Sequence, residues 1–207
     1  MSRQMNVIEH WDIAVQELSE RDKILKNIIS NYRGERLKLK NDGFLTLARA
    51  IVGQQISVKA ADTIWKRLEI TANGNISSTR IRELSTEQLR KTGLSSQKTA
   101  YLRNIAESEV LRTDWDECSD EKITEILCTI KGIGKWTAEM FLIFHLARPN
   151  VLPLADIGLV RAIEKNYNDG NGMSKEQFDG LGQKWSPWCT VTTWYLWRSL
   201  DPIPVEY

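Results

Sequence analysis

Apolar residues along this chain recur at spacings of three and four residues, and the strict alternation typical of a half-buried strand is scarce. Phe44, Leu47, Ala48 and Ile51 show the pattern, because residues three or four apart share one face of a helix. The spacing therefore predicts an all-α fold. No repeat, low-complexity tract or long linker divides the sequence, so we expect one compact helical protein.

Capping residues predict where several of the helices begin. Ser85 with Gln88, and Ser174 with Gln177, have the spacing of a capping box. Ser186-Pro187 has the pattern of a cap followed by a first-turn proline, which predicts a last helix from that point. The other expected helices cover residues 44–53, a stretch after Ser57, a short segment ending near Gly93, and residues 97–111, 120–128, 135–146 and 157–167.

The composition excludes several classes of protein. An apolar content of 42% and a net charge of +1 are typical of a globular chain. The longest apolar run, Met140 to Phe144, has five residues, whereas a membrane-spanning helix needs about 20. The first ten residues have no apolar stretch ahead of a cleavage site. We therefore expect no membrane association and an intracellular location, which is cytoplasmic in a bacterium or archaeon and nuclear in a eukaryote.

Cysteine and histidine are too few for a transition-metal site. The three cysteines, Cys118, Cys128 and Cys189, are odd in number and widely spaced, which favours reduced thiols over disulfides. The two histidines, His10 and His145, do not complete a zinc or iron-sulfur ligand set with them. The sequence therefore predicts chemistry without a tightly bound cofactor.

Eight tryptophans in 207 residues supply an unusual amount of large apolar surface. Trp65, Trp185, Trp188 and Trp194 fall at helical spacing, and we expect these four in the core because buried aromatic rings contribute strongly to packing.

The segment from Leu127 to Ala138 joins two expected helices through Gly132-Ile133-Gly134. Two glycines one residue apart allow a sharp turn with no side chain in the way. Consecutive amide N–H groups then lie at the start of the second helix, where a phosphate group can bind. Judged on these glycines alone, a simple tight connection between two helices explains the segment at least as well.

A carboxylate follows at Asp156, after Pro153 has forced an extended approach to the helix expected at 157–167. Asp is among the best helix-capping residues, so a purely structural role as N-cap is one interpretation. The two roles are compatible, because a helix N-terminus also favours the ionised carboxylate. Such an anion suits a site where positive charge develops during a reaction.

The glycine hairpin, followed by Pro153 and Asp156, resembles the signature of the helix-hairpin-helix DNA glycosylase superfamily. Two further stretches, 50–61 and 185–198, make the chain similar to the 3-methyladenine DNA glycosylase II branch, whose members act on alkylated purines. The resemblance covers roughly residues 40–200 in matching order. It implies two helical lobes, residues 43–148 and residues 1–42 plus 149–207, with the helix-hairpin-helix motif at 127–138 and an active-site cleft between the lobes.

The resemblance also assigns roles to individual positions. It implies that Asp156 is the catalytic carboxylate and that Gln55 fills the gap left by a flipped base. The remaining implied contacts are base-pocket side chains at Trp136, Met140 and Trp197, DNA contacts at Gly132, Ile133, Gly134, Lys135 and Thr137, and backbone carbonyls of Cys128, Ile130 and Ile133 around a Na⁺ or K⁺ ion when DNA is bound.

Two departures from related families bear on the reaction. Bifunctional members carry a nucleophilic lysine two residues past the second hairpin glycine, where this chain has Trp136, and Lys135 points about 100° away on a helix. The four-cysteine cluster of the endonuclease III branch is also absent after Tyr195. The resemblance therefore implies simple hydrolysis without a lyase step, by a monomer acting on double-stranded DNA that contains alkylated bases.

The charge of the substrate explains how one carboxylate is enough. An alkylated purine is already cationic, so its departure needs no general acid, in contrast to the two-carboxylate arrangement of glycoside hydrolases. An alternative is a helix-hairpin-helix protein that binds DNA as a non-catalytic damage sensor or scaffold. A third hypothesis, a glycosylase for neutral bases such as mismatched adenine or uracil, ranks below the alkylpurine glycosylase, since the sequence shows no proton donor for it.

Overall fold

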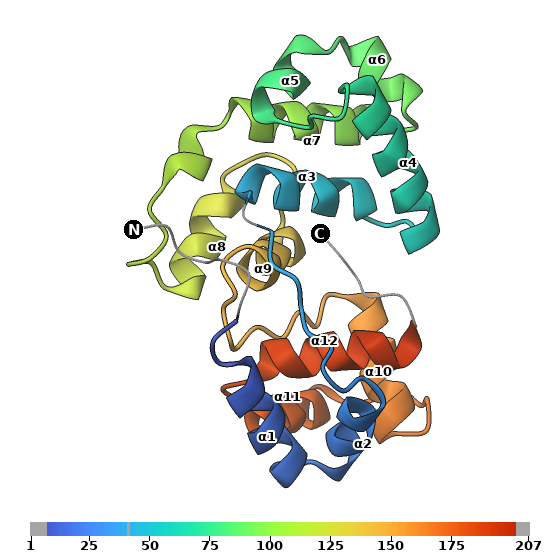
Figure 1. Cartoon of the computed structure of the whole chain (residues 1–207), viewed down its shortest axis with the longest axis vertical. Coiled ribbons are helices and arrows are strands. Elements are labelled where there is room, and N and C mark those ends of the chain that lie inside the picture. The colour runs from blue at the N-terminus through green and yellow to red at the C-terminus, as the bar shows by residue number, and fades with distance from the viewer. Residues whose placement is uncertain (1–7, 41, 202–207) are drawn as a thin grey trace. The chain divides into compact units, whose positions relative to one another are not determined.

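A computed structural model describes residues 8–40 and 42–201, which form α-helices, one 3₁₀ turn and no strand (Figure 1). This confirms the predicted all-α fold. The helices are α1 (Trp11–Arg21), α2 (Lys23–Asn31), α3 (Gly43–Gly53), α4 (Val58–Thr71), α5 (Ser78–Glu83), α6 (Thr86–Lys91), α7 (Ser96–Glu107), η1 (Glu109–Arg112), α8 (Asp120–Cys128), α9 (Lys135–Phe144), α10 (Ile157–Tyr167), α11 (Lys175–Trp185) and α12 (Cys189–Leu200).

Side-chain caps begin several of these helices where the sequence predicts them. Both capping boxes are present, Ser85 with Gln88 at α6 and Ser174 with Gln177 at α11. Ser57 caps α4 by accepting a hydrogen bond from a backbone amide of its first turn. The agreement arises because a cap satisfies donors only a few residues away, so local sequence is enough to specify it.

Two predicted helix bounds are wrong. The helix expected over 97–111 ends at Glu107, because Ser108 is extended and its hydroxyl accepts from Val110 to start the separate turn η1. Ser186-Pro187 does not begin the last helix. Ser186 instead closes α11, where its amide donates to the Gly182 carbonyl, and α12 begins only at Cys189.

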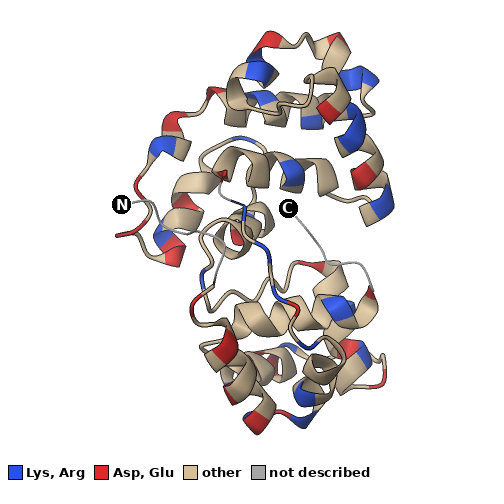
Figure 2. Cartoon of the chain, viewed as in Figure 1, with Lys and Arg blue, Asp and Glu red and all other residues tan. Residues whose placement is uncertain are grey.

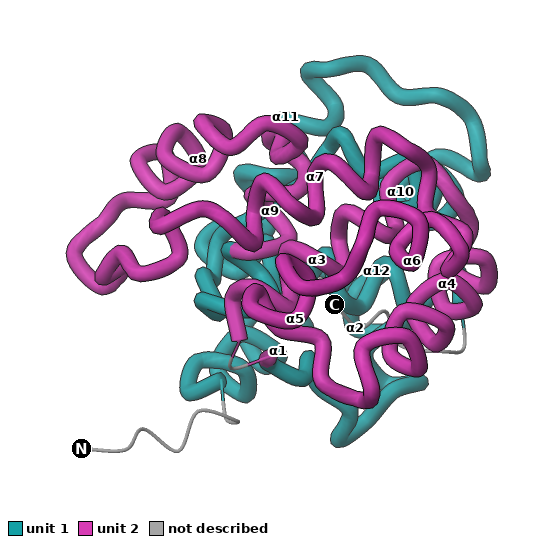
Figure 3. Tube along the Cα trace, turned by 90° about the horizontal axis from the view of Figure 1, so that it is seen from above, with its two compact units in different colours: residues 1–39, 142–206 teal, residues 40–141, 207 magenta. Residues whose placement is uncertain are grey.

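The chain divides into two compact units, which Figure 3 distinguishes by colour. Unit 1 comprises residues 1–39 and 142–206, and unit 2 comprises residues 40–141. Helix α9 begins in unit 2 and ends in unit 1. Within the described residues, no helix is long and apolar enough to span a bilayer. The expected lack of a signal segment concerns residues 1–10, of which 1–7 lie outside the described part.

Unit 2 is built around α3, which packs against α4 and α7 (Figure 1). Leu47, Ala48 and Ile51 of α3 are fully buried, so the stripe that marked this helix in the sequence forms the centre of the unit. Because α3 is buried, the position of the turn that follows it is fixed by the core of the unit. This turn, at residues 54–57, leads directly into α4.

Unit 1 is held by an aromatic cluster and by one buried carboxylate. The indole of Trp11 packs edge-on against Trp194 at 5.4 Å between ring centroids, and Trp194 packs edge-on against Tyr195 at 4.8 Å. Asp22 is 1% exposed. Its carboxylate accepts hydrogen bonds from the amides of Ile24 and Leu25, the hydroxyl of Tyr167, the indole of Trp185 and the ammonium of Lys184.

The prediction that four tryptophans lie in the core is confirmed for two of them. Trp185 and Trp194 are buried. Trp65 and Trp188 are only half-buried, and each donates its indole N–H to a glutamate, Glu69 and Glu17 respectively. For these two the prediction is wrong, because helical spacing does not distinguish a core position from the boundary where an indole keeps a polar partner.

Asp22 generates a prediction about pH and stability. Burial opposes its ionisation, but the hydrogen bonds it accepts, first that from Lys184, hold the pKa of this carboxyl below its ordinary value. A lowered folded-state pKa means that the stabilisation is complete above the unfolded-state value of about 3.9 and is lost as pH falls through the folded-state value. We expect Asp22→Asn to lower the free energy of unfolding by about 1 to 3 kcal/mol at neutral pH.

Urea denaturation of both proteins across acidic and neutral pH measures this effect. The difference between wild type and Asp22→Asn should narrow below about pH 4. A difference that stays constant with pH would show that the charge of Asp22 contributes nothing.

Candidate functional site

The turn between α8 and α9 places its first glycine against an aromatic ring. Gly132 has a φ of +110°, and a Cβ built there would lie 2.2 Å from Cγ of Tyr101. Both the backbone conformation and the contact with Tyr101 therefore require glycine at this position. The ring of Tyr101, on α7, packs against the backbone of the turn at Gly132.

The second glycine has a different explanation. Gly134 lies outside the left-handed region, and a Cβ built there would meet no atom within 4 Å. Folding therefore does not demand glycine at this position. Open space above a bare backbone instead allows close approach by a ligand, which is the second use of glycine in proteins.

The backbone around Gly134 is arranged as the start of a helix. Ala138 donates to the Gly134 carbonyl at 3.0 Å, so regular α9 bonding begins there. The amides of a helix's first turn point along the axis away from the helix and carry partial positive charge. Lys135 is exposed at this end, and its ammonium lies 3.8 Å from Glu139. Backbone donors and the Lys135 ammonium are thus both available to an anion at this turn.

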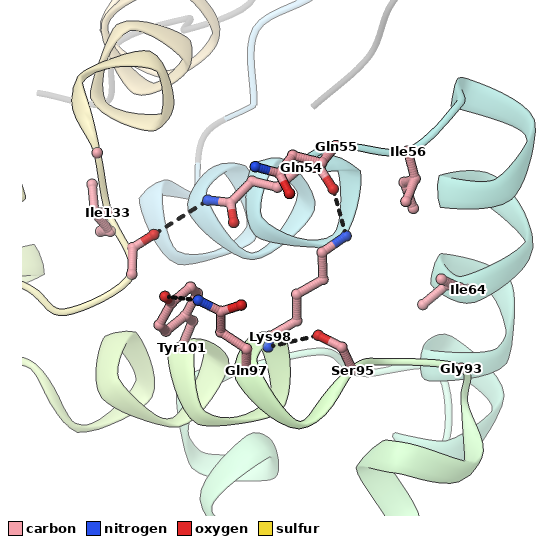
Figure 4. A pocket seen from close by; sticks show the side chains of 12 residues that line it. Gln54, Gln55, Ile56, Ile64, Gly93, Ser95, Gln97, Lys98, Tyr101 and Ile133 are labelled. Atoms are coloured by element: carbon pink, nitrogen blue, oxygen red, sulfur yellow. Dashed lines mark hydrogen bonds between the residues drawn. The ribbon is translucent and has the colours of Figure 1, made fainter.

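A hydrogen-bonded link joins this turn to the one that follows α3. The side-chain amide of Gln54 donates to the Gly132 carbonyl at 3.2 Å and to the Thr137 hydroxyl at 3.0 Å. The ammonium of Lys98 donates to the carbonyls of Val52 and Gln54 at 2.8 and 2.7 Å, and burial lowers the pKa of Lys98. Gln54 therefore joins the two turns, and Lys98 fixes the end of α3 against α7 (Figure 4).

Sequence reasoning missed Gln54, Lys98 and Tyr101. The hydrogen-bond partners of Gln54 and Lys98 lie 44 to 83 residues away in the sequence. No local sequence pattern therefore marks these residues. Thr137 was predicted as a DNA contact, but its side chain is 1% exposed and bound to Gln54. Only its backbone amide is left for that role. Ile133 is buried, and its amide donates to the Ile130 carbonyl at 3.0 Å.

Between the two turns lies a pocket of about 510 Å³ (Figure 4). Its lining comes from the α3–α4 turn, the start of α7 and the glycine turn, and includes Gln55, Ile56, Ile64 and Gln97. Gln55 is exposed and has a φ of +56°, which is rare for a residue with a side chain. Such backbone strain often accompanies a functional position, which supports Gln55 as a predicted contact residue.

The carboxylate of Asp156, in unit 1, is fixed by two hydrogen bonds. Its Oδ1 accepts from the Leu159 amide at 2.7 Å and from the Trp197 indole at 3.1 Å. The first bond confirms that Asp156 is the N-cap of α10. The side chain is half-buried, while the next residue, Ile157, is 69% exposed. Asp156 is therefore both a cap and an oriented carboxylate near the surface of its unit.

The three predicted base-pocket residues differ in exposure. Trp136 is half-buried, Met140 is fully buried, and Trp197 is 7% exposed. The ring of Trp197 stacks on Phe144 at 6.0 Å between centroids, and its N–H is bound to Asp156. Trp197 thus orients the carboxylate. Their roles in holding a base stay predictions.

The carbonyls predicted to bind a monovalent cation belong to the same glycine turn. Cys128 is the last residue of α8, where the helix dipole places partial negative charge on carbonyl oxygens. The Ile130 carbonyl accepts one amide bond from Ile133, and a carbonyl oxygen has a second lone pair. Oxygen donors suit hard cations, so these residues fit such an ion. The described residues contain no cluster of His, Cys, Asp and Glu for a metal.

Comparison with known proteins places these features in a family. Residues 48–187 match the model of the HhH-GPD superfamily base excision DNA repair protein. DNA-3-methyladenine glycosylase 1 of Schizosaccharomyces pombe is 32% identical over 195 residues, which cover 91% of this chain and 86% of that protein. A putative DNA-3-methyladenine glycosylase of Bacillus subtilis is 29% identical over 215 residues, with 97% and 75% covered.

Solved structures agree with these matches. A Schizosaccharomyces pombe 3-methyladenine DNA glycosylase in complex with abasic DNA superposes with a TM-score of 0.80 and 32% identity, covering 90% of this chain and 95% of that chain. A DNA-3-methyladenine glycosidase of Bacillus halodurans gives a TM-score of 0.73 and 36% identity, with 90% and 88% covered.

The two glycines of the turn predict opposite outcomes for one substitution. Gly132→Ala meets both a clash with Tyr101 and a disfavoured φ, and we expect it to lower the free energy of unfolding by about 2 to 4 kcal/mol. Gly134→Ala should stay within about 0.5 kcal/mol of wild type and still weaken binding of duplex DNA, because its methyl group occupies the open approach. Chemical denaturation and a DNA titration test both. Wild-type affinity in Gly134→Ala would show that no ligand approaches there.

Proposed function

Because the chain belongs to the HhH-GPD superfamily of base excision DNA repair proteins, we propose that it is a monofunctional DNA glycosylase for alkylated purines. It flips a 3-methyladenine or 7-methylguanine type of base out of duplex DNA and hydrolyses the N-glycosidic bond. The observation that carries the proposal is the carboxylate of Asp156, held in one orientation by the Leu159 amide and the Trp197 indole.

The chemistry assigned to Asp156 is electrostatic. As the glycosidic bond breaks, positive charge develops on the deoxyribose, and a preorganised anion lowers the free energy of that transition state. The leaving purine takes the bonding electrons, which cancel its positive charge. It therefore departs as a neutral base, and no proton donor is needed. Water then adds to the sugar and loses a proton. The bond from Trp197 limits rotation of the carboxylate, so little reorganisation is required during the reaction.

The glycine turn binds the DNA backbone. Backbone amides at the start of α9 hold a phosphate group, and Gly134 leaves room for it. This mode of binding explains how a chain with a net charge of only +1 binds a polyanion. Carbonyls of Cys128, Ile130 and Ile133 would hold a Na⁺ or K⁺ ion beside that phosphate, where the ion reduces the local negative charge.

Four further residues are assigned roles at the flipped nucleotide. Gln55, exposed at its strained turn, enters the duplex and fills the space of the flipped nucleotide. Trp136, with Met140 and Trp197, holds the cationic base, for which an aromatic face contributes roughly 1 to 2 kcal/mol. The protein acts as an intracellular monomer on double-stranded DNA.

Hydrolysis without strand cleavage follows from the residue types at the start of α9. A lyase step needs an amine that attacks the sugar, and position 136 carries an indole instead. The neighbouring amine, Lys135, faces Glu139 one helical turn away. The intact abasic strand is therefore the final product.

Asp156→Asn tests the catalytic assignment without removing the helix cap, because Asn is an equally good N-cap. Loss of the negative charge should slow release of 7-methylguanine from methylated duplex DNA by about 10² to 10³-fold under single-turnover conditions. DNA affinity and thermal stability should change little.

Asp42→Asn provides a matched control. Asp42 caps α3 by accepting from the Leu45 amide, so the same chemical change occurs at a second helix start. Base release by Asp42→Asn should equal that of wild type. Wild-type base release by Asp156→Asn would instead favour the alternative of a non-catalytic DNA-binding protein with a contaminating activity.

The absence of a lyase step is tested on the products of the wild-type reaction. Resolved before and after treatment with alkali, they should contain no nicked strand until alkali is added.

A panel of modified duplexes tests the charge argument separately. The cationic lesions 3-methyladenine and 7-methylguanine should be released at least about tenfold faster than the neutral ethenoadenine and hypoxanthine, a difference of about 1.4 kcal/mol in activation free energy. Undamaged DNA of the same sequence is the control. Release of the neutral lesions alone would overturn the mechanism, since neutral bases need a proton donor.

A further inference from the structure

One face of α4 carries three exposed cations, Lys59, Lys66 and Arg67. Residues seven and eight positions apart share a face of a helix, so the three side chains project from the same side. We call Lys59, Lys66 and Arg67 the α4 basic face. Figure 2 shows Lys and Arg along this helix.

The acidic residues of α4 are bound elsewhere. Asp62 pairs with Arg49 of α3, and Glu69 accepts the indole N–H of Trp65. Lys66 has Asp62 four residues before it and Glu69 three residues after it, the spacings at which pairs form within a helix. It nevertheless pairs with neither. Across residues 8–40 and 42–201, the α4 basic face forms no ion pair.

Several other cations of unit 2 are paired within the fold, Arg80 with Glu83, Lys91 with Glu87, and Lys135 with Glu139. Among the described residues, exposed Arg82, Arg90 and Lys131 form no ion pair either, but they lie on three different elements: α5, α6 and the glycine turn. The three cations of α4 differ because they share one helical face. Three unpaired cations on one helical face form a local concentration of positive charge, which is the electrostatic footprint of a polyanion site.

The α4 basic face begins next to the pocket. Lys59 lies four positions after Gln55, and Ser57 between them caps α4. The guanidinium of Arg67 lies 3.6 Å from the position of a Cβ on Gly93, which lines the pocket. Ile64 of α4 also lines the pocket but lies about 200° around the helix from Lys66. Figure 4 shows the glycine turn and α4 on opposite sides of this pocket. The basic face therefore borders the pocket at Arg67 and does not line it.

The opposite side of unit 2 has the reverse charge. The segment 107–125 leads into α8 and is rich in acidic residues, of which Asp114, Glu117 and Glu121 are exposed. Both of its basic residues are paired, Arg112 with Glu109 and Lys122 with Glu125. In Figure 1 this segment and α4 lie on opposite sides of α3. A polyanion bound at the glycine turn is thus attracted toward α4 and repelled from segment 107–125.

We propose that the α4 basic face binds the phosphate backbone of the duplex whose lesion strand is held by the glycine turn. The proposal rests on the function proposed above. From Lys59 to Arg67 the helix rises about 12 Å, the rise of roughly three to four base pairs of duplex DNA. The surface contacts phosphates on the far side of Gln55 from the glycine turn and extends the footprint along the helix axis. It adds affinity and orientation without reading sequence.

The test is the salt dependence of binding to an undamaged duplex. Each phosphate contact by a cation contributes about 0.9 to the slope of log affinity against log salt concentration. The triple variant Lys59→Gln, Lys66→Gln, Arg67→Gln should therefore show a slope smaller by about 2 to 3. Between about 50 and 200 mM salt, wild type should lose roughly 40-fold more affinity than the triple variant.

The double variant Arg112→Gln, Lys122→Gln is the matched control, because it removes exposed cations from the acidic side. Its slope should equal that of wild type. The triple variant should unfold at the wild-type temperature, since its side chains form no ion pair that folding depends on.

The outcomes separate this proposal from the proposed function. An unchanged slope in the triple variant would identify the three side chains as solvated surface cations and overturn the inference. An equal loss of slope in the control would do the same, because it would indicate a general charge effect. Absence of base release in the wild type would refute the glycosylase function, whereas the slope measured on undamaged DNA would still decide whether α4 contacts the backbone.

Discussion

The contact of Tyr101 with Gly132 is the constraint on which the glycine turn, our proposed DNA-binding turn, depends. A ring from α7 occupies the space that any side chain at 132 would need, so the backbone must turn there in a conformation only glycine accepts readily. Gln54 then ties this turn to the end of α3, and Lys98 ties α7 to the same end of α3. The backbone at Gly134, two residues further on, is open.

At Asp156, one carboxylate oxygen takes part in two interactions. Asp156 caps α10 and accepts the Trp197 indole through the same oxygen, so the interactions that stabilise the helix also fix the direction of the anion. A side chain at Gly158 would come within 3.1 Å of that oxygen, and glycine there keeps the approach uncrowded. Structural capping and the proposed catalytic role therefore use one geometry, which is why neither excludes the other at this position.

The distribution of charge matters more here than its total. With a net charge of +1, attraction to DNA cannot come from an excess of cations over the whole chain. Backbone amides supply positive potential at the glycine turn, and the α4 basic face supplies it beside the pocket because Asp62 and Glu69 are bound to other partners. Helix pairing patterns read from sequence would assign Lys66 to an intrahelical pair. The tertiary contact between Asp62 and Arg49, together with the bond from Trp65 to Glu69, leaves it available.

By itself, the sequence determined the features that depend on near neighbours: the all-α fold, the two capping boxes, the helix that Asp156 begins, and the family, whose resemblance the family match confirms. It did not reveal that Ser186 closes one helix instead of starting the next, or that Trp65 and Trp188 stay half-buried. Tertiary structure alone decided which groups support the site. Gln54, Lys98, Tyr101 and the bond from Trp197 to Asp156 all act across tens of residues, and such partners are set by how helices pack, which no local spacing encodes.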